Sequence, residues 1–107
     1  MNVGRYLVAA AITIMSASGT IAAHAQTGAE TYKAKCMMCH AVDGSASTPA
    51  GKAMKAIPFS SPDLVKASDA DLIAATTNGK GKMPAYTSKL TAPQIKDVVA
   101  YIRTLQK

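Results

Sequence analysis

The chain has 107 residues, of which 49% are apolar and 17% charged, and its formal net charge is +6 at pH 7. This length accommodates one small domain, or one domain and a targeting segment, and excludes a Rossmann enzyme, a barrel or a multidomain catalyst. Aromatic residues are scarce, with one Phe, four Tyr and no Trp. A core built from this chain alone therefore lacks the largest side chains that usually fill one.

The first 25 residues have the pattern of a secretory signal peptide. Arg5 precedes a run of ten mostly apolar residues, and a Ser/Gly/Thr-rich stretch leads to an A-x-A sequence that ends at Ala25. We predict cleavage after Ala25, which leaves a mature domain over residues 26–107 with eleven basic and six acidic side chains. The alternative is a retained membrane anchor, because the segment is long enough to reach across a bilayer. Either way, the domain is expected in the periplasm or an equivalent extracytoplasmic compartment.

The mature domain carries helix signals and no convincing strand alternation. Capping residues and prolines predict where helices start, and Asn-Gly and Lys-rich stretches predict loops. Two long loops are expected, over residues 41–59 and 79–89, and the class is all-α with four or five short helices. Helices are expected from Thr27 toward Cys36, from Pro62 for a short stretch, from Ser68 to Asn78 and from Thr91 to about Gln106, with one further turn after Pro49.

The sequence Cys36-Met37-Met38-Cys39-His40 is C-x-x-C-H, the covalent attachment site of a c-type haem. On a helical turn, positions i and i+3 face the same way, so both thiols can reach the two vinyl groups of one porphyrin. His40 then offers an imidazole nitrogen to the iron as the proximal axial ligand. We therefore predict one covalently bound haem c, held by Cys36 and Cys39.

Other uses of this motif fit the chain less well. A structural zinc site needs four N or S ligands, and the mature chain supplies only three, since the second histidine of the sequence, His24, belongs to the signal segment. A thioredoxin-like C-x-x-C needs a βαβ setting. A disulfide between the two cysteines would explain neither the histidine directly after them, His40, nor the lack of large side chains to fill the core. A bound haem accounts for both, and we expect the apoprotein to be largely disordered.

The candidates for the second axial ligand are methionines, because the mature chain has no other histidine. Met37 and Met38 lie within the attachment turn and cannot reach the opposite face of the haem. Met83 lies in a Gly-, Lys- and Pro-rich loop between two expected helices, where a side chain is well placed for presentation to a metal. We predict Met83 as the distal ligand, with Met54 and an open or water-bound iron as the alternatives. His/Met ligation favours ferrous iron and one-electron transfer.

The sequence resembles class I cytochromes c, especially the small soluble carriers of the cytochrome c6 type. The resemblance rests on the C-x-x-C-H motif, on Gly28-x-x-x-Tyr32 before it, on Tyr101 in the last helix and on the loop around Met83. It implies the small cytochrome c fold, a monohaem electron carrier, and a first and last helix that cross with Gly28 permitting close approach. It also implies a proline carbonyl that accepts a hydrogen bond from the Nδ1 of His40; Pro49 and Pro58 are both candidates.

The expected role is one-electron transfer between protein redox partners by a soluble monomer, not catalysis. The alternatives are an electron-transfer subunit of a larger oxidase or dehydrogenase complex and a haem peroxidase or sensor. The latter needs a distal His or Arg, and Arg103 is the only arginine of the mature chain. Nucleic-acid binding is not supported. Five loop lysines either maintain solubility or form a docking ring for an acidic partner: Lys52, Lys55, Lys80, Lys82 and Lys89.

Overall fold

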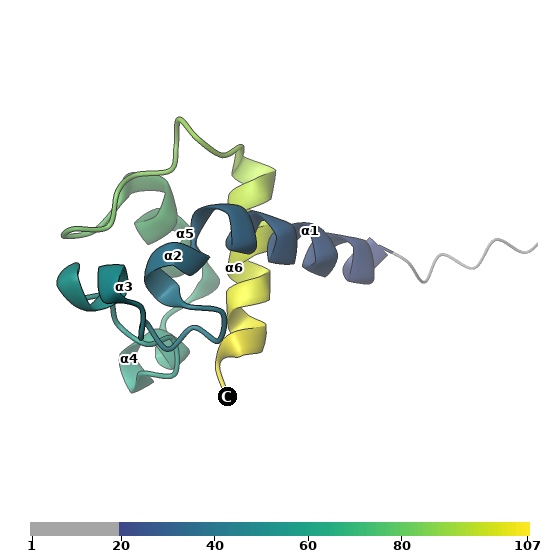
Figure 1. The fold of residues 1–107 in the computed structure, drawn as a ribbon. Helices are drawn as coiled ribbons and strands as arrows, with labels where there is room; N and C mark the ends of the chain where they lie inside the picture. Colours follow the sequence, from purple (N-terminus) through teal and green to yellow (C-terminus); the bar gives the residue numbers. More distant parts are fainter. Residues whose placement is uncertain (1–19) are drawn as a thin grey trace, which may run out of the picture.

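The structure, a computed structural model, describes the backbone of residues 20–107 and the side chains from Thr27 onward. Most of the predicted signal peptide lies outside these described residues. Within them the chain is helical and forms no strand, which confirms the all-α prediction. Six helices follow one another (Figure 1), one more than expected: α1 (Thr20–Lys35), α2 (Met37–His40), α3 (Pro49–Ala53), α4 (Pro62–Lys66), α5 (Asp69–Asn78) and α6 (Ala92–Leu105).

The first helix starts earlier than predicted. The expected capping box at Thr27 lies inside α1, because the preceding alanine-rich sequence has high helix propensity and α1 begins at Thr20. The additional helix, α2, arises because the backbone turns at Cys36, which separates the attachment turn from α1. The cleavage site after Ala25 therefore falls within α1 of the unprocessed chain, and cleavage there stays a prediction. No helix of the described part combines the length and apolarity that crossing a bilayer requires.

Side-chain caps mark the starts of α3, α5 and α6, whereas α4 begins at Pro62 without one. Thr91 and Gln94 form a capping box at the start of α6, with reciprocal hydrogen bonds of 2.8 Å and 3.3 Å. Ser68 accepts a hydrogen bond from the Asp71 backbone N–H at the start of α5. Thr48 does the same for Gly51 at the start of α3. Each cap satisfies a backbone donor that has no partner within its own helix.

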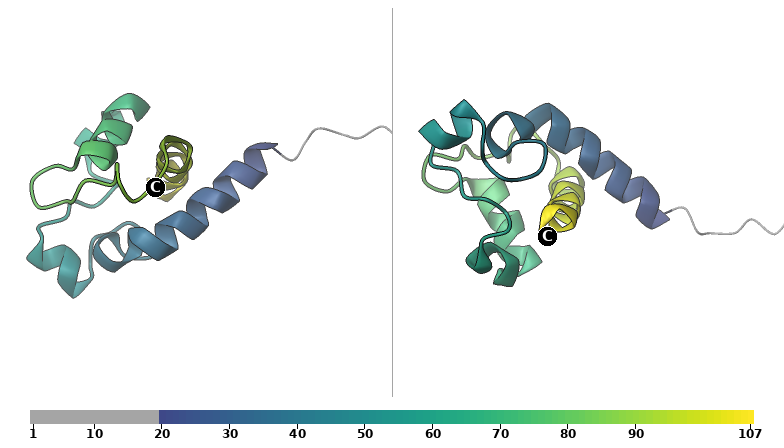
Figure 2. Two further views of the ribbon diagram at one scale, coloured as in Figure 1. Left: turned by 90° about the horizontal axis from the view of Figure 1, so that it is seen from above. Right: turned by 60° about the horizontal axis from the view of Figure 1, so that its bottom comes forward.

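The first and last helices cross and form the centre of the domain (Figures 1 and 2). They meet at Gly28, where a Cβ would collide with the Asp97 carbonyl and lie only 3.1 Å from the Tyr101 Cβ. Tyr32 packs beside this crossing, with its ring centroid 5.3 Å from that of Tyr101. The crossing expected from the family resemblance is therefore present, and both tyrosines pack beside it.

A small hydrophobic core extends from the crossing toward α2 and the loop after α3. Its buried members come from three separate segments of the chain: Tyr32, Cys36, Phe59, Val98 and Ile102. Leu105 packs against the core from its edge, and the apolar residues that recur along α6 at helical spacing are buried: Ile95, Val98, Val99 and Ile102. The core is thus concentrated along one side of α6, next to the attachment turn.

Arg103 fastens α4 and α5 to α6. Its guanidinium donates to the Leu64 carbonyl at 3.1 Å and to the Ala67 carbonyl at the end of α4. It also donates to the carboxylate of Asp69, the first residue of α5, at 2.8 Å. This single side chain therefore satisfies carbonyl groups left free at a helix C-terminus and holds two helices in place.

Candidate functional site

The predicted haem residues all line one cavity of about 490 Å³. This volume lies within the range of small-molecule and cofactor sites. Cys36, Cys39 and His40 reach it from the attachment turn, and Met83 reaches it from the loop after α5. Aliphatic side chains complete much of the wall, among them Ile57, Leu64, Leu72, Val98 and Ile102. Four residues that the sequence assigns to one haem are therefore brought together around a largely apolar space.

The attachment turn is a short helical segment held by its own backbone. The N–H groups of Cys39 and His40 both donate to the Cys36 carbonyl, at 3.2 Å and 3.0 Å. Both cysteines are free thiols; Cys36 is buried and Cys39 half-buried. Burial, with a smaller contribution from Cys39, raises the pKa of the Cys36 thiol to about 11. The turn thus presents two thiols and an imidazole to the same cavity.

The residue after His40 has an unusual backbone conformation that a buried tyrosine stabilises. Ala41 has a φ of 66°, in the region that L-residues rarely adopt. The Tyr32 hydroxyl donates a buried hydrogen bond of 2.5 Å to the Ala41 carbonyl. Burial is the main cause that raises the pKa of this hydroxyl, so it stays a donor. Tyr32 is therefore a core residue that also holds the backbone where the chain leaves the attachment turn.

His40 has the properties of an available metal ligand. Burial lowers the pKa of its imidazole, which favours the neutral ring with a free nitrogen lone pair. Its Nδ1 is buried and has no hydrogen-bond partner among the described residues. Two thiols, a neutral imidazole and a thioether around an apolar cavity are a donor set that fits a covalently attached haem.

The hydrogen bond expected between His40 and a proline carbonyl is absent from the described residues. The Pro58 carbonyl instead accepts from the Ser61 backbone N–H at 3.0 Å, and Pro49 is the first residue of α3. In place of that bond, the imidazole stacks on the Phe59 ring, with centroids 4.7 Å apart and planes inclined by 20°. No sequence motif predicts this stacking contact between Phe59 and His40.

A tight backbone reversal presents Met83. Gly79 ends α5 with a φ of 77°, and a Cβ there would lie 2.7 Å from the Met83 carbonyl oxygen. Lys80 and Met83 then pair through two backbone hydrogen bonds of 3.2 Å and 3.0 Å, with Gly81 at a positive φ between them. Only glycine fits comfortably at these positions. The Gly-Lys-Gly-Lys-Met sequence is therefore a backbone hairpin that turns Met83 toward the cavity.

Met54 also lines the cavity, from the end of α3, and is 40% exposed. It is thus the second methionine that reaches this space, as the sequence alternatives allowed. Met38 is 78% exposed on α2 and does not belong to the cavity lining. The geometry leaves Met83 and Met54 as the methionines to compare by experiment.

Tyr86 closes the cavity wall between the methionine loop and the first helix. Its hydroxyl donates to the Lys35 carbonyl at 3.1 Å, and its backbone N–H donates to the Thr76 carbonyl at 3.0 Å. Burial raises the pKa of the hydroxyl, which therefore remains protonated and able to donate. This link between the methionine loop and the end of α1 has no signal in the local sequence.

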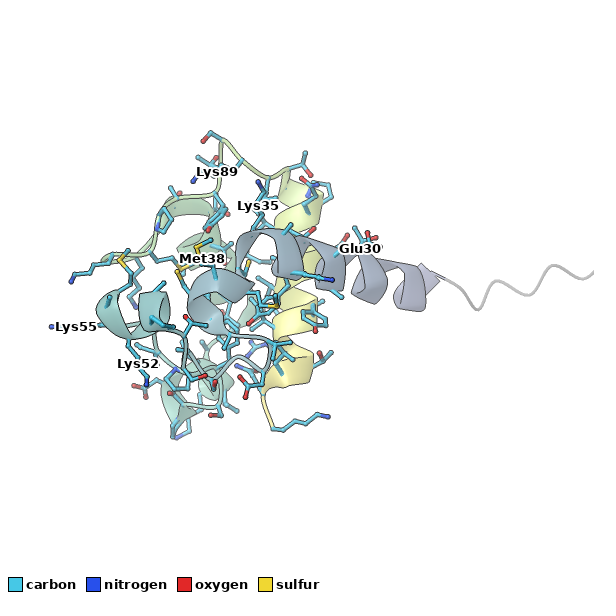
Figure 3. The ribbon with its side chains drawn as sticks, in the orientation of Figure 1. Glu30, Lys35, Met38, Lys52, Lys55 and Lys89 are labelled. Atoms are coloured by element: carbon cyan, nitrogen blue, oxygen red, sulfur yellow. The ribbon has the colours of Figure 1, made fainter. Side chains whose placement is uncertain are left out.

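Positive charge surrounds the mouth of the cavity. Four of the described lining residues are lysines and none is Asp or Glu: Lys35, Lys55, Lys80 and Lys82. In Figure 3, Lys52 on α3 and Lys55 just after this helix extend outward. The acidic Glu30 lies on the part of α1 that is farther from α3. Three of the five lysines in the predicted docking ring therefore line the cavity: Lys55, Lys80 and Lys82.

The helical fold, the attachment turn and the cavity together define a small c-type cytochrome. Residues 23–102 match the family described as cytochrome c oxidase, cbb3-type, subunit III. Cytochrome c6 of Nostoc sp. is 36% identical over 93 residues, which cover 87% of this chain and 81% of that protein. The chain belongs to this cytochrome c family as a small monohaem class I member, and its domain binds one haem c covalently.

Two further comparisons agree with this assignment. The subunit CcoP of a cbb3-type cytochrome c oxidase from Azospirillum brasilense is 31% identical over 100 residues, which cover 92% of this chain and 34% of that subunit. The solved structure of the KustC0563 c-type cytochrome superposes with a TM-score of 0.69 at 30% identity, covering 75% of this chain and 98% of that one. The chain is therefore a c-type cytochrome electron carrier.

Proposed function

We propose that the chain is a periplasmic one-electron carrier whose haem is attached through Cys36 and Cys39, with His40 and Met83 as the axial ligands. The observation that carries this proposal is that these four side chains line one apolar cavity. Haem, when bound, supplies an iron that accepts and releases one electron. The chain's own residues hold it, exclude water and keep two ligands in fixed positions.

Each of the four residues has a distinct task. Cys36 and Cys39 would hold the haem through thioether bonds to its vinyl groups, which would keep the cofactor with an exported protein. His40, neutral because burial lowers its pKa, donates its lone pair. Met83 supplies a soft thioether that raises the reduction potential relative to a second histidine. Because two protein ligands leave no open position, electron transfer is favoured over substrate chemistry.

The position of Arg103 supports a carrier rather than a peroxidase. A peroxidase needs a distal acid–base group at the iron, and this arginine is the one available in the mature chain. Its guanidinium is instead bound to the Ala67 carbonyl and the Asp69 carboxylate, and it does not line the cavity. The similarity to CcoP favours a second candidate, an electron-transfer module of a larger oxidase complex. Copurification of the native protein with a membrane oxidase would favour this candidate over a free carrier.

The lysine rim supports docking to acidic redox proteins. Four lysines and no carboxylate are among the described residues that line the cavity. Complementary charge accelerates association and orients the two proteins, so electron transfer can occur where the haem is least covered.

The ligand assignment is tested by optical spectroscopy of the haem-loaded protein. Met83→Ala is expected to abolish the weak far-red sulfur-to-iron band of the oxidised form. Met54→Ala is the matched control, because Met54 lines the same cavity, and it should retain the band. If Met54→Ala loses the band and Met83→Ala keeps it, the distal ligand is Met54.

A further inference from the structure

The plane of the His40 imidazole is covered on one side by an aromatic ring. Phe59 stacks on it with centroids 4.7 Å apart and an interplanar angle of 20°. Phe59 is only 8% exposed, so this contact is part of the core and not a surface arrangement. An imidazole that binds through one nitrogen can still rotate about the bond to its Cβ, and a flat neighbour restricts that rotation.

No hydrogen bond fixes the same imidazole within the described residues. Its Nδ1 is buried without a partner. A ligating histidine usually has its ring orientation set by a hydrogen bond from this second nitrogen. Since that bond is absent here, the stacked ring is the contact that can define the imidazole plane.

The Phe59 ring is itself tightly held. Its backbone N–H donates to the Gly44 carbonyl at 3.0 Å. A Cβ on Gly44, which has a φ of +76°, would lie 2.6 Å from the Phe59 Cδ2, so the ring occupies the space that this glycine leaves. The Tyr32 ring meets it edge to face at a centroid distance of 6.2 Å. These contacts come from two different parts of the chain, the loop at Gly44 and α1.

Gln106 anchors Phe59 to the last helix. Its Nε2 donates to the Phe59 carbonyl at 3.1 Å, and its Oε1 accepts from the Arg103 Nη1 at 3.1 Å. Arg103 is in turn bound to the Asp69 carboxylate. A continuous set of contacts therefore links α5 and α6 to the ring that lies against His40.

We propose that Phe59 is a positioning residue that fixes the plane of the His40 imidazole, and that Gln106 holds Phe59 in place. The inference rests on the proposed function, in which His40 is an axial ligand. The orientation of the imidazole plane governs how strongly its π electrons overlap with each iron d orbital. It therefore affects the reduction potential and the distribution of unpaired spin over the ferric haem.

The test uses the haem-loaded protein and compares Phe59→Leu with Phe59→Tyr. Leu keeps an apolar side chain but has no flat face, whereas Tyr keeps the ring. Val99→Ala is the matched control, because Val99 is fully buried on α6, lies outside the cavity lining and offers no ring to the imidazole. The readouts are the haem methyl shifts in the NMR spectrum of the ferric protein, the midpoint potential and the thermal unfolding midpoint.

Phe59→Leu should change the pattern of methyl shifts and move the midpoint potential, and Phe59→Tyr should restore both toward wild type. Val99→Ala should lower the unfolding midpoint while leaving the methyl pattern unchanged. Gln106→Met, at the half-buried end of α6, should produce a smaller change of the same kind as Phe59→Leu. It provides a second test if Phe59→Leu does not fold.

The proposal is overturned if Phe59→Leu, or Gln106→Met in its place, keeps the wild-type methyl pattern, or if Val99→Ala alters it equally. Failure of the proposed function looks different. In that case the wild-type protein itself would lack covalent haem or would be high-spin. A low-spin wild type with an unchanged Phe59→Leu pattern would reject only the positioning role.

Discussion

The Tyr86 hydroxyl donates a hydrogen bond of 3.1 Å to the Lys35 carbonyl, joining residues 51 positions apart. Lys35 is the last residue of α1, directly before the first cysteine of the attachment motif. Tyr86 lies three residues after Met83 and is also bound through its backbone to Thr76 on α5. The two sides of the haem cavity are thus connected by one side chain, which makes Tyr86 a strap between the attachment turn and the methionine loop.

Tyr86→Phe should weaken the methionine loop without removing the ring from the cavity wall. Loss of the hydrogen bond is expected to cost about 1 kcal/mol of unfolding free energy. The far-red band of the oxidised protein should disappear at a lower temperature than in wild type. Tyr101→Phe is the control, since Tyr101 contacts Tyr32 through its ring. Equal thermal stability of the band in both variants would argue against a strap.

Gly28→Ala should destabilise the crossing of α1 and α6. The added Cβ collides with the Asp97 carbonyl, a backbone atom that can move only if the helices separate. Overpacking of this kind costs about 1–3 kcal/mol. Chemical denaturation measures the loss, and Ala34→Ser on the exposed side of α1 should change stability by less than about 0.5 kcal/mol. A Gly28→Ala protein as stable as wild type would contradict the close approach.

Haem removal should leave the chain largely disordered. The buried core borders a cavity of about 490 Å³, and a domain this small has little other apolar surface to bury. Far-ultraviolet circular dichroism should show strong helix signal in the haem-loaded protein and little in the apoprotein. A folded apoprotein with cooperative thermal unfolding would refute this expectation.

Replacement of the rim lysines should slow electron transfer to an acidic partner. Lys80→Gln with Lys82→Gln is expected to reduce the association rate about tenfold at low ionic strength, because it removes two charges at the cavity mouth. Lys66→Gln with Lys96→Gln removes the same charge from exposed positions outside the cavity. Stopped-flow kinetics should show a clear difference between the two pairs. Rates that are independent of ionic strength would speak against docking through the rim.

Much of the candidate site could be predicted because its chemistry lies in short, local patterns. The C-x-x-C-H spacing assigns three residues within one turn, and the Gly- and Pro-rich loop singles out Met83. Helix starts at Ser68 and Thr91 follow from capping chemistry, which depends on neighbouring residues alone. The family resemblance added the crossing at Gly28.

The remaining features depend on contacts between distant segments. Gln106 carries no local signal, yet it holds the backbone of Phe59 from 47 positions away. The stacking of Phe59 on His40 results from how the loop after α3 folds against α2, and no periodicity encodes it. The start of α1 was also predicted wrongly, for a local reason. Thr27 has the sequence pattern of a helix cap, but the residues before it have high helix propensity and the helix already begins at Thr20.

The central claim is a six-coordinate haem held by Cys36, Cys39, His40 and Met83 that transfers single electrons. Spectroelectrochemical titration of the purified haem-loaded protein tests it most directly. The account predicts a reversible one-electron transition between two low-spin forms, with a sharp c-type α-band when reduced and the far-red sulfur-to-iron band when oxidised. A high-spin, five-coordinate spectrum in either state would contradict it.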